Sequence, residues 1–380
     1  MLTKSIGLLQ TKSSVNKSGK PRCDKVLVLT VFLLVTIGLI FVYSASNYSA
    51  QATYGNKYYF VVKQAIGAAV GVVAFFLCAE ISLNFLRKLW IVGVVVSAVL
   101  LGLVFVPGIG IENYGAKRWI GFGSFSLQPS EISKFAYVLF CAVFMAKFDM
   151  GKFRYAVVPL AVGGVLCLLV ITEPNMSVTV CMAVVMVIML LIGGVKWRFF
   201  LFVSLPLVVA VPLLILMEPY RVQRLLAFLD PWASPKGEGY QLIQSLYALG
   251  SGGWFGVGLF NSRQKFRFLP FAESDFVFSV IGEETGLFGC LSVFLLYAVL
   301  IQRGVRIALN GSGKFEFFLA SGITAVIAVQ ALVNFAVVTG SIPPTGLPLP
   351  FVSYGGTSLV VFMAASGVLV NLSKASAPHY

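Results

Sequence analysis

Residues 155–195 read YAVVPLAVGGVLCLLVITEPNMSVTVCMAVVMVIMLLIGGV and contain one charged side chain, Glu173. The stretch holds two apolar runs, 155–172 and 176–195, which are separated by the short segment EPN. Each run is close to the roughly 20 apolar residues that a helix needs to cross a bilayer. The stretch therefore predicts two consecutive membrane-spanning helices.

Apolar runs of the same kind recur along the whole chain. Hydrophobic residues make up 58% of the 380 positions and charged residues 11%, and the mean hydropathy is +0.93. Soluble proteins are about 45–50% apolar and about 25% charged. We expect an all-α polytopic membrane protein with about ten transmembrane helices, near residues 25–44, 59–79, 89–106, 130–147, 155–172, 176–195, 199–217, 276–301, 317–338 and 351–372.

The distribution of positive charge predicts the orientation of these spans. Ten spans put both termini on one side, and most of the 28 Lys and Arg residues then lie in the tails and loops of that side. Positive residues near span ends favour the cytosol. We expect a disordered basic cytosolic tail (1–24), a ten-helix membrane domain (25–373) and a cytosolic C-terminal tail (374–380). The net charge of +14 therefore reflects topology. No nucleic-acid-binding module is recognisable.

The longest connection, residues 218–275, is predicted to be an outer loop between spans 7 and 8. It is rich in glycine, and residues 240–249 (YQLIQSLYAL) favour a short amphipathic helix lying on the bilayer. Loops of this length in compact proteins are functional or disordered. Its basic residues indicate an anionic partner at that face: Arg221, Arg224, Lys236, Arg263, Lys265 and Arg267.

Asp275 ends this loop, directly before an apolar run. Three interpretations stay open for its carboxylate: a general base, a cap on the helix that follows, or a solvated surface group. Glu283 and Glu284 follow within the apolar run, where charge is costly unless it is paired. We expect them to brace the helix through a polar network rather than to react.

A second cluster lies before and within the fourth span. Lys117 and Arg118 flank Trp119, whose ring suits a membrane interface, so they are either snorkelling side chains or substrate contacts. Glu131 and Lys134 are three residues apart on a predicted helix, hence on one face. They are expected to form an ion pair or to line a polar cavity.

A third segment, residues 339–359, contains four prolines and four glycines and cannot form a regular span. Irregular backbone at membrane depth survives only when it is buried in protein or lines a cavity. Ser353 lies in this segment, as a structural hydroxyl or as a polar group of the cavity.

Several classes of chemistry are excluded by composition. The single histidine, His379, is next to last, which leaves no histidine-based metal site or triad. The six cysteines show neither metal spacing nor a disulfide pattern. Phosphate-binding loop, HExxH and GxSxG motifs are missing. No metal ligands can be identified from the sequence.

Four segments resemble, in the same order, the signature sequences of the SEDS family (shape, elongation, division and sporulation). They read GAKRWI and QPSEISK within 115–134, YRVQRLLAFLDPWASPKGEGYQLIQSLYALGSGGWFGVGL at 220–259, NSRQKFRFLPFAESDFVFSVIGEETG at 261–286, and LPFVSYGGTS at 349–358. The resemblance covers nearly all of the chain after residue 25. The NSRQK start is more similar to FtsW and SpoVE than to RodA.

The resemblance implies a peptidoglycan glycosyltransferase of the bacterial cytoplasmic membrane, active at the division septum. Such enzymes polymerise lipid II into lipid-linked glycan, together with a class B penicillin-binding protein and other division proteins. By motif, Asp275 is the catalytic aspartate, and Trp119, Glu131, Lys134 and Ser353 line the central cavity. A divalent cation, Mg²⁺ or Mn²⁺, would assist, and no organic cofactor is expected.

The chain departs from the family pattern at two motifs. The family has PEAHTDF where this chain has PFAESDF at 270–276, and QPD or EPD followed by LGT where it has EPNMS at 173–177. A role of the second acid would have to pass to Glu173. Two other functions remain as alternatives, a lipid II flippase and a non-catalytic division scaffold.

Overall fold

The computed structural model describes residues 23–113, 116–122, 125–196, 198–199, 219–266 and 268–375. The predicted span 199–217 after its first residue, most of the 1–24 tail and the last residues of the chain lie outside these ranges. The helices before the long loop are α2 (Lys25–Tyr54), α3 (Tyr59–Glu80), α4 (Leu83–Lys88), α5 (Trp90–Leu103), α6 (Pro129–Lys147), α7 (Phe153–Thr172) and α8 (Met176–Ile192). The later helices are α10 (Pro219–Leu229), η1 (Pro231–Ala233), α11 (Tyr240–Gly252), α12 (Val277–Leu309), α13 (Lys314–Val338) and α14 (Gly356–Ala375).

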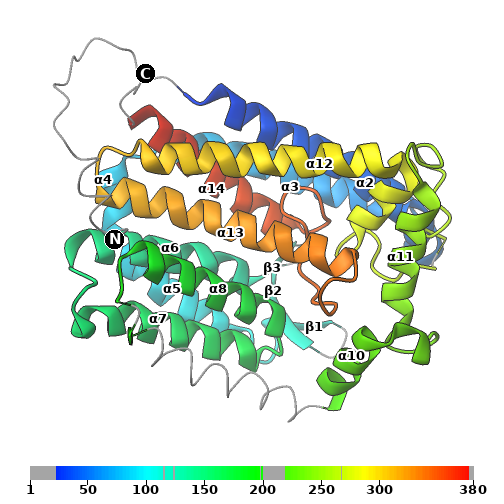
Figure 1. Cartoon of the computed structure of the whole chain (residues 1–380), viewed down its shortest axis with the longest axis horizontal. Helices are drawn as coiled ribbons and strands as arrows, with labels where there is room; N and C mark the ends of the chain where they lie inside the picture. The colour runs from blue at the N-terminus through cyan, green and yellow to red at the C-terminus, as the bar shows by residue number, and fades with distance from the viewer. Residues whose placement is uncertain are drawn as a thin grey trace.

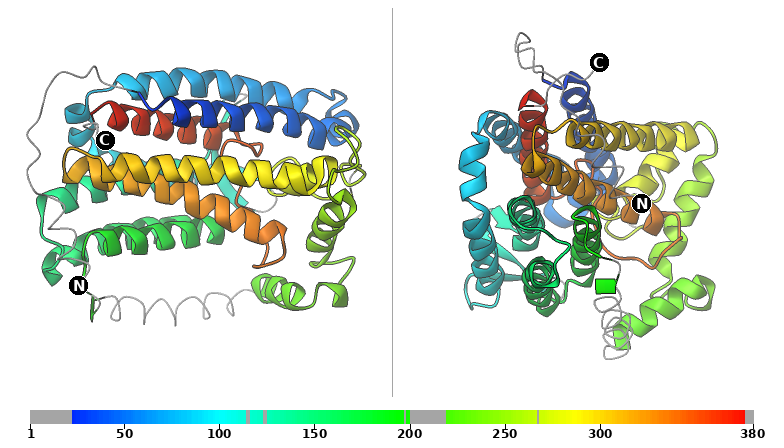
Figure 2. Two further views of the ribbon diagram at one scale, coloured as in Figure 1. Left: turned by 45° about the horizontal axis from the view of Figure 1, so that its top comes forward. Right: turned by 60° about the vertical axis from the view of Figure 1, so that its left-hand side comes forward.

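The long helices pack side by side into one bundle, and α10 and α11 lie at one end of it (Figure 1). Helix α14 packs against α3, and α13 packs against α6 and α12. Figure 2 shows α2 and α3 beside α14 and α12, although these pairs are far apart in sequence. Seven helices of the described part are long and apolar enough to span a membrane, and α5 and α8 are shorter apolar helices. The chain is a multi-pass membrane protein, and nine of the ten predicted spans coincide with helices.

The all-helical expectation is corrected by a small sheet between α5 and α6. Strands β1 (Gly110–Asn113), β2 (Ala116–Phe122) and β3 (Phe125–Leu127) form an antiparallel meander. Ile120 pairs with both Gly110 and Leu127 and is 1% exposed.

Helix α14 begins at Gly356 and not near 351, because the preceding segment is held in a non-helical form by side chains from the bundle. The amide of Gln64 donates to Ser353 O at 3.0 Å and accepts from Gly355 N at 3.1 Å. Gln330 donates to Pro348 O at 2.9 Å. The buried irregular backbone that the prolines predict is therefore satisfied by amide side chains of apolar helices.

The two described ends of the chain meet at the end of the bundle opposite to α11. Asp24 N donates to Ser373 Oγ at 3.1 Å, and the Asp24 carboxylate pairs with Arg303 of α12 at 2.7 Å. These contacts join the start of α2 to the C-terminal parts of α12 and α14.

Candidate active site

Asp275 lies in the junction between the long loop and α12. Its side chain is half-buried, and its carboxylate oxygen Oδ2 is 3.3 Å from the position that a Cβ on Gly346 would take. Its main-chain carbonyl accepts a hydrogen bond of 2.9 Å from Asn334 of α13. The N-cap of α12 is Phe276, and no side chain caps this helix. The capping interpretation of Asp275 is therefore wrong.

The surroundings of Asp275 suit a general base. Partial burial raises the pKa of its carboxyl to about 6, although a hydrogen bond from Ser274 and the charges of Arg224 and Arg118 lower it. A base works best when its pKa is near the working pH. Two guanidinium groups from distant segments thus act on one carboxylate.

Both arginines are held in place by main-chain carbonyls. Arg224 of α10 donates from Nη1 to Pro344 O at 3.3 Å. Arg118 of β2 donates from Nε to Glu173 O at 3.3 Å and from Nη2 to Pro174 O at 2.5 Å. The Arg224 contact ties α10 to the proline-rich segment, and the Arg118 contacts tie β2 to the turn between α7 and α8.

Glu173 is the second acid near this site. Its side chain is fully buried, and neither carboxylate oxygen has a hydrogen-bond partner among the described residues. Burial raises the pKa of this carboxyl to about 8, and the nearby Arg118 lowers it only in part. We expect Glu173 to carry a proton at neutral pH.

Replacing Glu173 by Gln should stabilise the protein at alkaline pH. The folded-state pKa of about 8 is higher than the ordinary value of 4.5, so the wild-type chain loses stability as pH rises between these values. The loss is at most about 5 kcal/mol, from about 1.4 kcal/mol per pKa unit. Thermal unfolding in detergent should give equal midpoints for the two proteins at pH 5 and a higher midpoint for the variant at pH 9. A lower midpoint of the variant at both pH values would contradict the protonated state.

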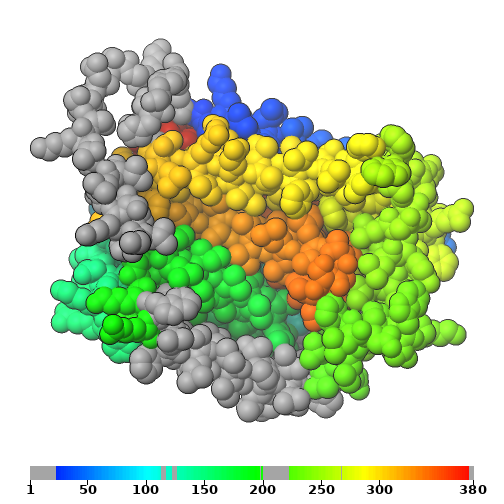
Figure 3. Space-filling view, viewed as in Figure 1, coloured from blue at the N-terminus to red at the C-terminus, as the bar shows by residue number. Residues whose placement is uncertain are grey.

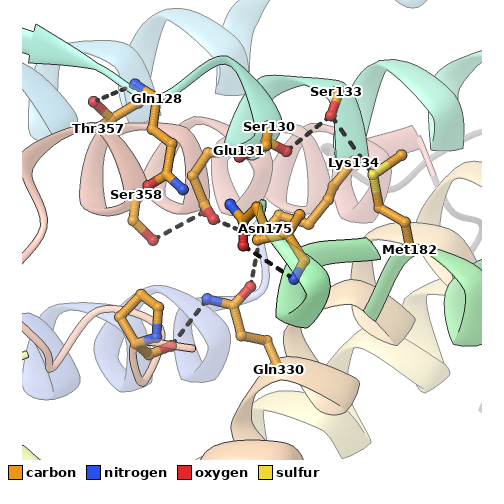
Figure 4. Close-up of polar contacts among 12 residues, drawn as sticks. Gln128, Ser130, Glu131, Ser133, Lys134, Asn175, Met182, Gln330, Thr357 and Ser358 are labelled. Carbon is orange, nitrogen blue, oxygen red and sulfur yellow. Dashed lines mark hydrogen bonds and ion pairs between the residues drawn. The ribbon is translucent and has the colours of Figure 1, made fainter. Parts of the chain in front are cut away.

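Glu131 and Lys134 form the ion pair that their spacing predicts, with 2.8 Å between Lys134 Nζ and Glu131 Oε1. Both side chains are 1% exposed. Lys134 Nζ also donates to Gln330 Oε1 at 2.5 Å, and Ser358 Oγ donates to Glu131 Oε2 at 3.1 Å. Figure 4 shows these side chains directed at one another. The pair is therefore packed between α6, α13 and α14, with its charges satisfied by protein groups.

Glu283 and Glu284 form the predicted polar network, but its partners include residues of the long loop, which it joins to α12. Ser262 donates its hydroxyl to Glu283 and its main-chain N–H to Glu284, the latter at 3.3 Å. Ser44 of α2 donates to Glu284 at 2.5 Å. Lys265, predicted as a substrate contact, is 5% exposed and lies 3.7 Å from Glu284, so in this conformation it belongs to this network.

The remaining predicted site residues lie in different surroundings. Lys117 is exposed and Trp119 half-buried, both on β2 with Arg118. The hydroxyl of Ser353 accepts from Leu349 N at 2.8 Å, which is a structural role. The side chain of Arg221 lies outside the described residues.

Sequence reasoning missed the residues that hold the site together. Gln64, Gln330 and Asn334 donate hydrogen bonds to buried backbone carbonyls. Gly346, which has a φ of 74°, leaves room for the Asp275 carboxylate. A signal for the first three existed, because an uncharged amide in an apolar helix needs a partner inside the bundle. Their partners were not readable from the sequence.

The comparisons with known proteins agree with this architecture. A family model described as FtsW/RodA/SpoVE cell cycle protein matches residues 24–377. The chain is 41% identical over 357 residues to stage V sporulation protein E of Bacillus subtilis, covering 93% of this chain and 97% of that protein. It is 40% identical over 360 residues to the probable peptidoglycan glycosyltransferase FtsW of Trichlorobacter lovleyi, covering 92% and 93%.

Solved structures show the same fold. One chain, from a study of "Structural coordination of polymerization and crosslinking by a peptidoglycan synthase complex", superposes with a TM-score of 0.77 at 27% identity, covering 92% of this chain and 97% of that chain. The rod shape determining protein RodA of Thermus thermophilus superposes with a TM-score of 0.71 at 25% identity, covering 94% and 98%. The chain belongs to the FtsW/RodA/SpoVE family of cell cycle proteins.

Proposed function

We propose that this protein is a peptidoglycan glycosyltransferase that polymerises lipid II at the outer face of the cytoplasmic membrane during cell division. The observation that carries the proposal is the half-buried carboxylate of Asp275, with a pKa of about 6 and with Arg118 and Arg224 acting on it. The names of the relatives support the reaction class.

The reaction needs one base and a stabiliser of negative charge. A sugar hydroxyl of the incoming lipid-linked disaccharide attacks the anomeric carbon of the growing chain and gives its proton to Asp275. A new C–O bond forms to that carbon, and its bond to the phosphate oxygen breaks with departure of the polyprenyl diphosphate. Because this leaving group needs charge stabilisation rather than a proton, a second carboxylate is unnecessary, unlike in glycoside hydrolysis. Guanidinium groups such as those of Arg118 and Arg224 suit phosphate oxygens.

A divalent cation, Mg²⁺ or Mn²⁺, fits this site only if the substrate shares it. The described residues contain no group of three or more His, Cys, Asp or Glu side chains placed to hold a metal. Glu273 lies near Asp275. Burial raises the pKa of the Glu273 carboxyl, and the charge of Asp275 raises it further. Mg²⁺ is commonly bound through one or two carboxylates together with substrate phosphates. Asp275 and Glu273 would hold it, and it would neutralise charge on the leaving diphosphate.

We also propose a class B penicillin-binding protein as partner at the division septum. The structural neighbour from a peptidoglycan synthase complex supports an assembly of polymerising and crosslinking subunits. The partner would crosslink the strands that this chain makes.

The pH dependence of polymerisation should follow Asp275. The base acts when it is unprotonated, so the rate is fully present above a pKa of about 6 and falls as pH drops through that value. Arg224 lowers this pKa, so Arg224→Ala should move the acidic limb of the rate profile to higher pH. The matched control is Arg263→Ala, an exposed arginine of the same loop, which should leave the limb in place. An unshifted limb in Arg224→Ala would contradict the electrostatic contact.

The orientation of the chain can be tested with single cysteines. In a background without the six native cysteines, Lys236→Cys in the long loop should react with a membrane-impermeant thiol reagent in intact spheroplasts. Ala375→Cys, at the end where Asp24 meets Ser373, should react only after lysis. Both positions are exposed in the structure. Labelling of residue 375 but not of residue 236 would place Asp275 in the cytosol and end the proposed mechanism.

A further inference from the structure

Four large apolar side chains form one exposed patch where the segment after α11 meets α12. We define this aromatic patch as Trp254, Phe255, Leu287 and Phe288, with exposed fractions of 65%, 81%, 41% and 52%. The ring of Phe288 lies 5.2 Å from that of Phe255 and 6.2 Å from that of Trp254. Contiguous exposed apolar patches mark surfaces that another molecule or a membrane covers.

The patch is held rigidly by the backbone. Helix α12 is kinked at Gly286, which has φ of 66°. Leu287 N donates to Gly253 O at 2.9 Å, and Phe288 N donates to Trp254 O at 3.3 Å. A Cβ on Gly286 would lie 2.4 Å from Gly256 N, so only glycine permits this approach. The two aromatic residues of the loop are thus fixed against α12.

The position of the patch along α12 matches a bilayer boundary. Beyond the kink, exposed apolar residues continue down the helix at Leu291 and Leu295, which extend the patch into an exposed apolar stripe. A rise of about 1.5 Å per residue places Phe288 about 27 Å from Arg306, in the last turn of α12. This length is close to the about 30 Å of bilayer hydrocarbon. Tryptophan is enriched at such boundaries.

The same loop turns its polar side inward. Glu283 and Glu284, just before the kink, are each 1% exposed and receive hydrogen bonds from Ser262. Val257 N donates to Glu283 O at 2.9 Å. One face of the loop is therefore polar and hydrogen-bonded to buried carboxylates inside the protein, and the opposite face is apolar and exposed. Figure 3 shows the loop region at the end of the molecule beside α12.

We propose that the aromatic patch is seated in the headgroup–acyl boundary of the lipid bilayer. The lipid, rather than a protein, is the occupant because the patch continues the exposed apolar stripe of α12, a helix long and apolar enough to span a membrane. Seating the patch fixes the depth of the segment that leads to Asp275. That this depth helps the reaction rests on the proposed function, because the diphosphate of a lipid-linked substrate lies at the same boundary.

Trp254 itself can report its surroundings. A variant that keeps only Trp254, with Trp90, Trp119, Trp197 and Trp232 replaced by Phe, is reconstituted in phosphatidylcholine–phosphatidylglycerol vesicles. Lipids brominated near the glycerol end of the acyl chain should reduce Trp254 emission about twofold or more, because interfacial segments insert about 5–10 Å into this boundary. Bromines near the terminal methyl should quench less, and aqueous iodide should quench little. The control carries a single Trp at the exposed position Lys236 and should respond to iodide instead.

A second probe keeps the test decisive if the multiple replacements disturb folding. A spin label at Phe255→Cys, in a Cys-free chain, should be relaxed more strongly by oxygen than by a water-soluble nickel complex. Strong iodide quenching of Trp254 equal to that of the control would overturn the proposal. Quenching by neither iodide nor brominated lipid would also overturn it and assign the patch to protein contact. Neither measurement requires polymerase activity, so its failure is distinguishable from failure of the proposed function.

Discussion

Asp275→Asn should reduce glycan polymerisation by about 10²–10⁴-fold, the usual contribution of a general base. The amide has nearly the same shape but cannot accept the proton of the attacking hydroxyl. The fold should persist, because the structure uses the main-chain carbonyl of Asp275, and not its carboxylate, to bind Asn334. Because burial raises the pKa of this carboxyl to about 6, its charge costs folding stability above that pH, and Asp275→Asn should unfold at a midpoint no lower than that of the wild type in detergent.

The control for this variant is Glu112→Gln, which removes an exposed carboxylate from β1. Polymer formation from lipid-linked disaccharide is measured for both proteins at equal amounts in membranes. Wild-type rates in Asp275→Asn would remove Asp275 from catalysis. Loss of activity together with loss of the folded protein would instead indicate a structural role for its carboxylate.

Breaking the ion pair between Glu131 and Lys134 should destabilise the bundle by about 3–5 kcal/mol, since each single change leaves an unpaired buried charge. Lys134→Met removes the ammonium partner of Glu131 and leaves it the hydrogen bond from Ser358. Glu131→Gln leaves the Lys134 ammonium with Gln330. The double variant should be more stable than the sum of the single effects predicts.

A double-mutant cycle measures this coupling by thermal or denaturant unfolding in detergent. We expect an interaction free energy near the upper part of the usual range of about 0.5–3 kcal/mol for contacting residues. The matched cycle uses Arg87 and Glu316, a pair with the arginine side chain 42% exposed, and should give a smaller coupling. Simple additivity for Glu131 and Lys134 would show that the pair does not act as a unit.

The sequence predicted the fold class because apolar runs of bilayer length leave few alternatives. It also predicted the contact between Glu131 and Lys134, because their spacing in one helix determines their geometry. The β1–β3 sheet was missed, since its strands are short and lie between spans. The true start of α14 was missed because it depends on Gln64, which lies nearly 300 residues earlier in the chain.

The sequence predicted which residues belong to the site around Asp275, but it did not predict that they come together. Asp275, Arg118 and Arg224 were each named from separate segments, and their convergence depends on tertiary packing that no local pattern contains. Lys265 illustrates the opposite case, because its charge suggested a substrate contact while the fold pairs it with Glu284. Glu173 was recognised only through a motif, and its burial without partners comes from the structure.

The central claim is that this chain itself joins lipid-linked disaccharides. The direct measurement is reconstitution of the purified protein in liposomes with purified lipid II, with and without the class B penicillin-binding protein. The partner carries an inactivated crosslinking site. The account predicts glycan polymer that depends on Asp275. Transbilayer movement of lipid II without polymer would favour a flippase. The absence of both polymer and movement, with the partner present, would leave a scaffold and would contradict the account.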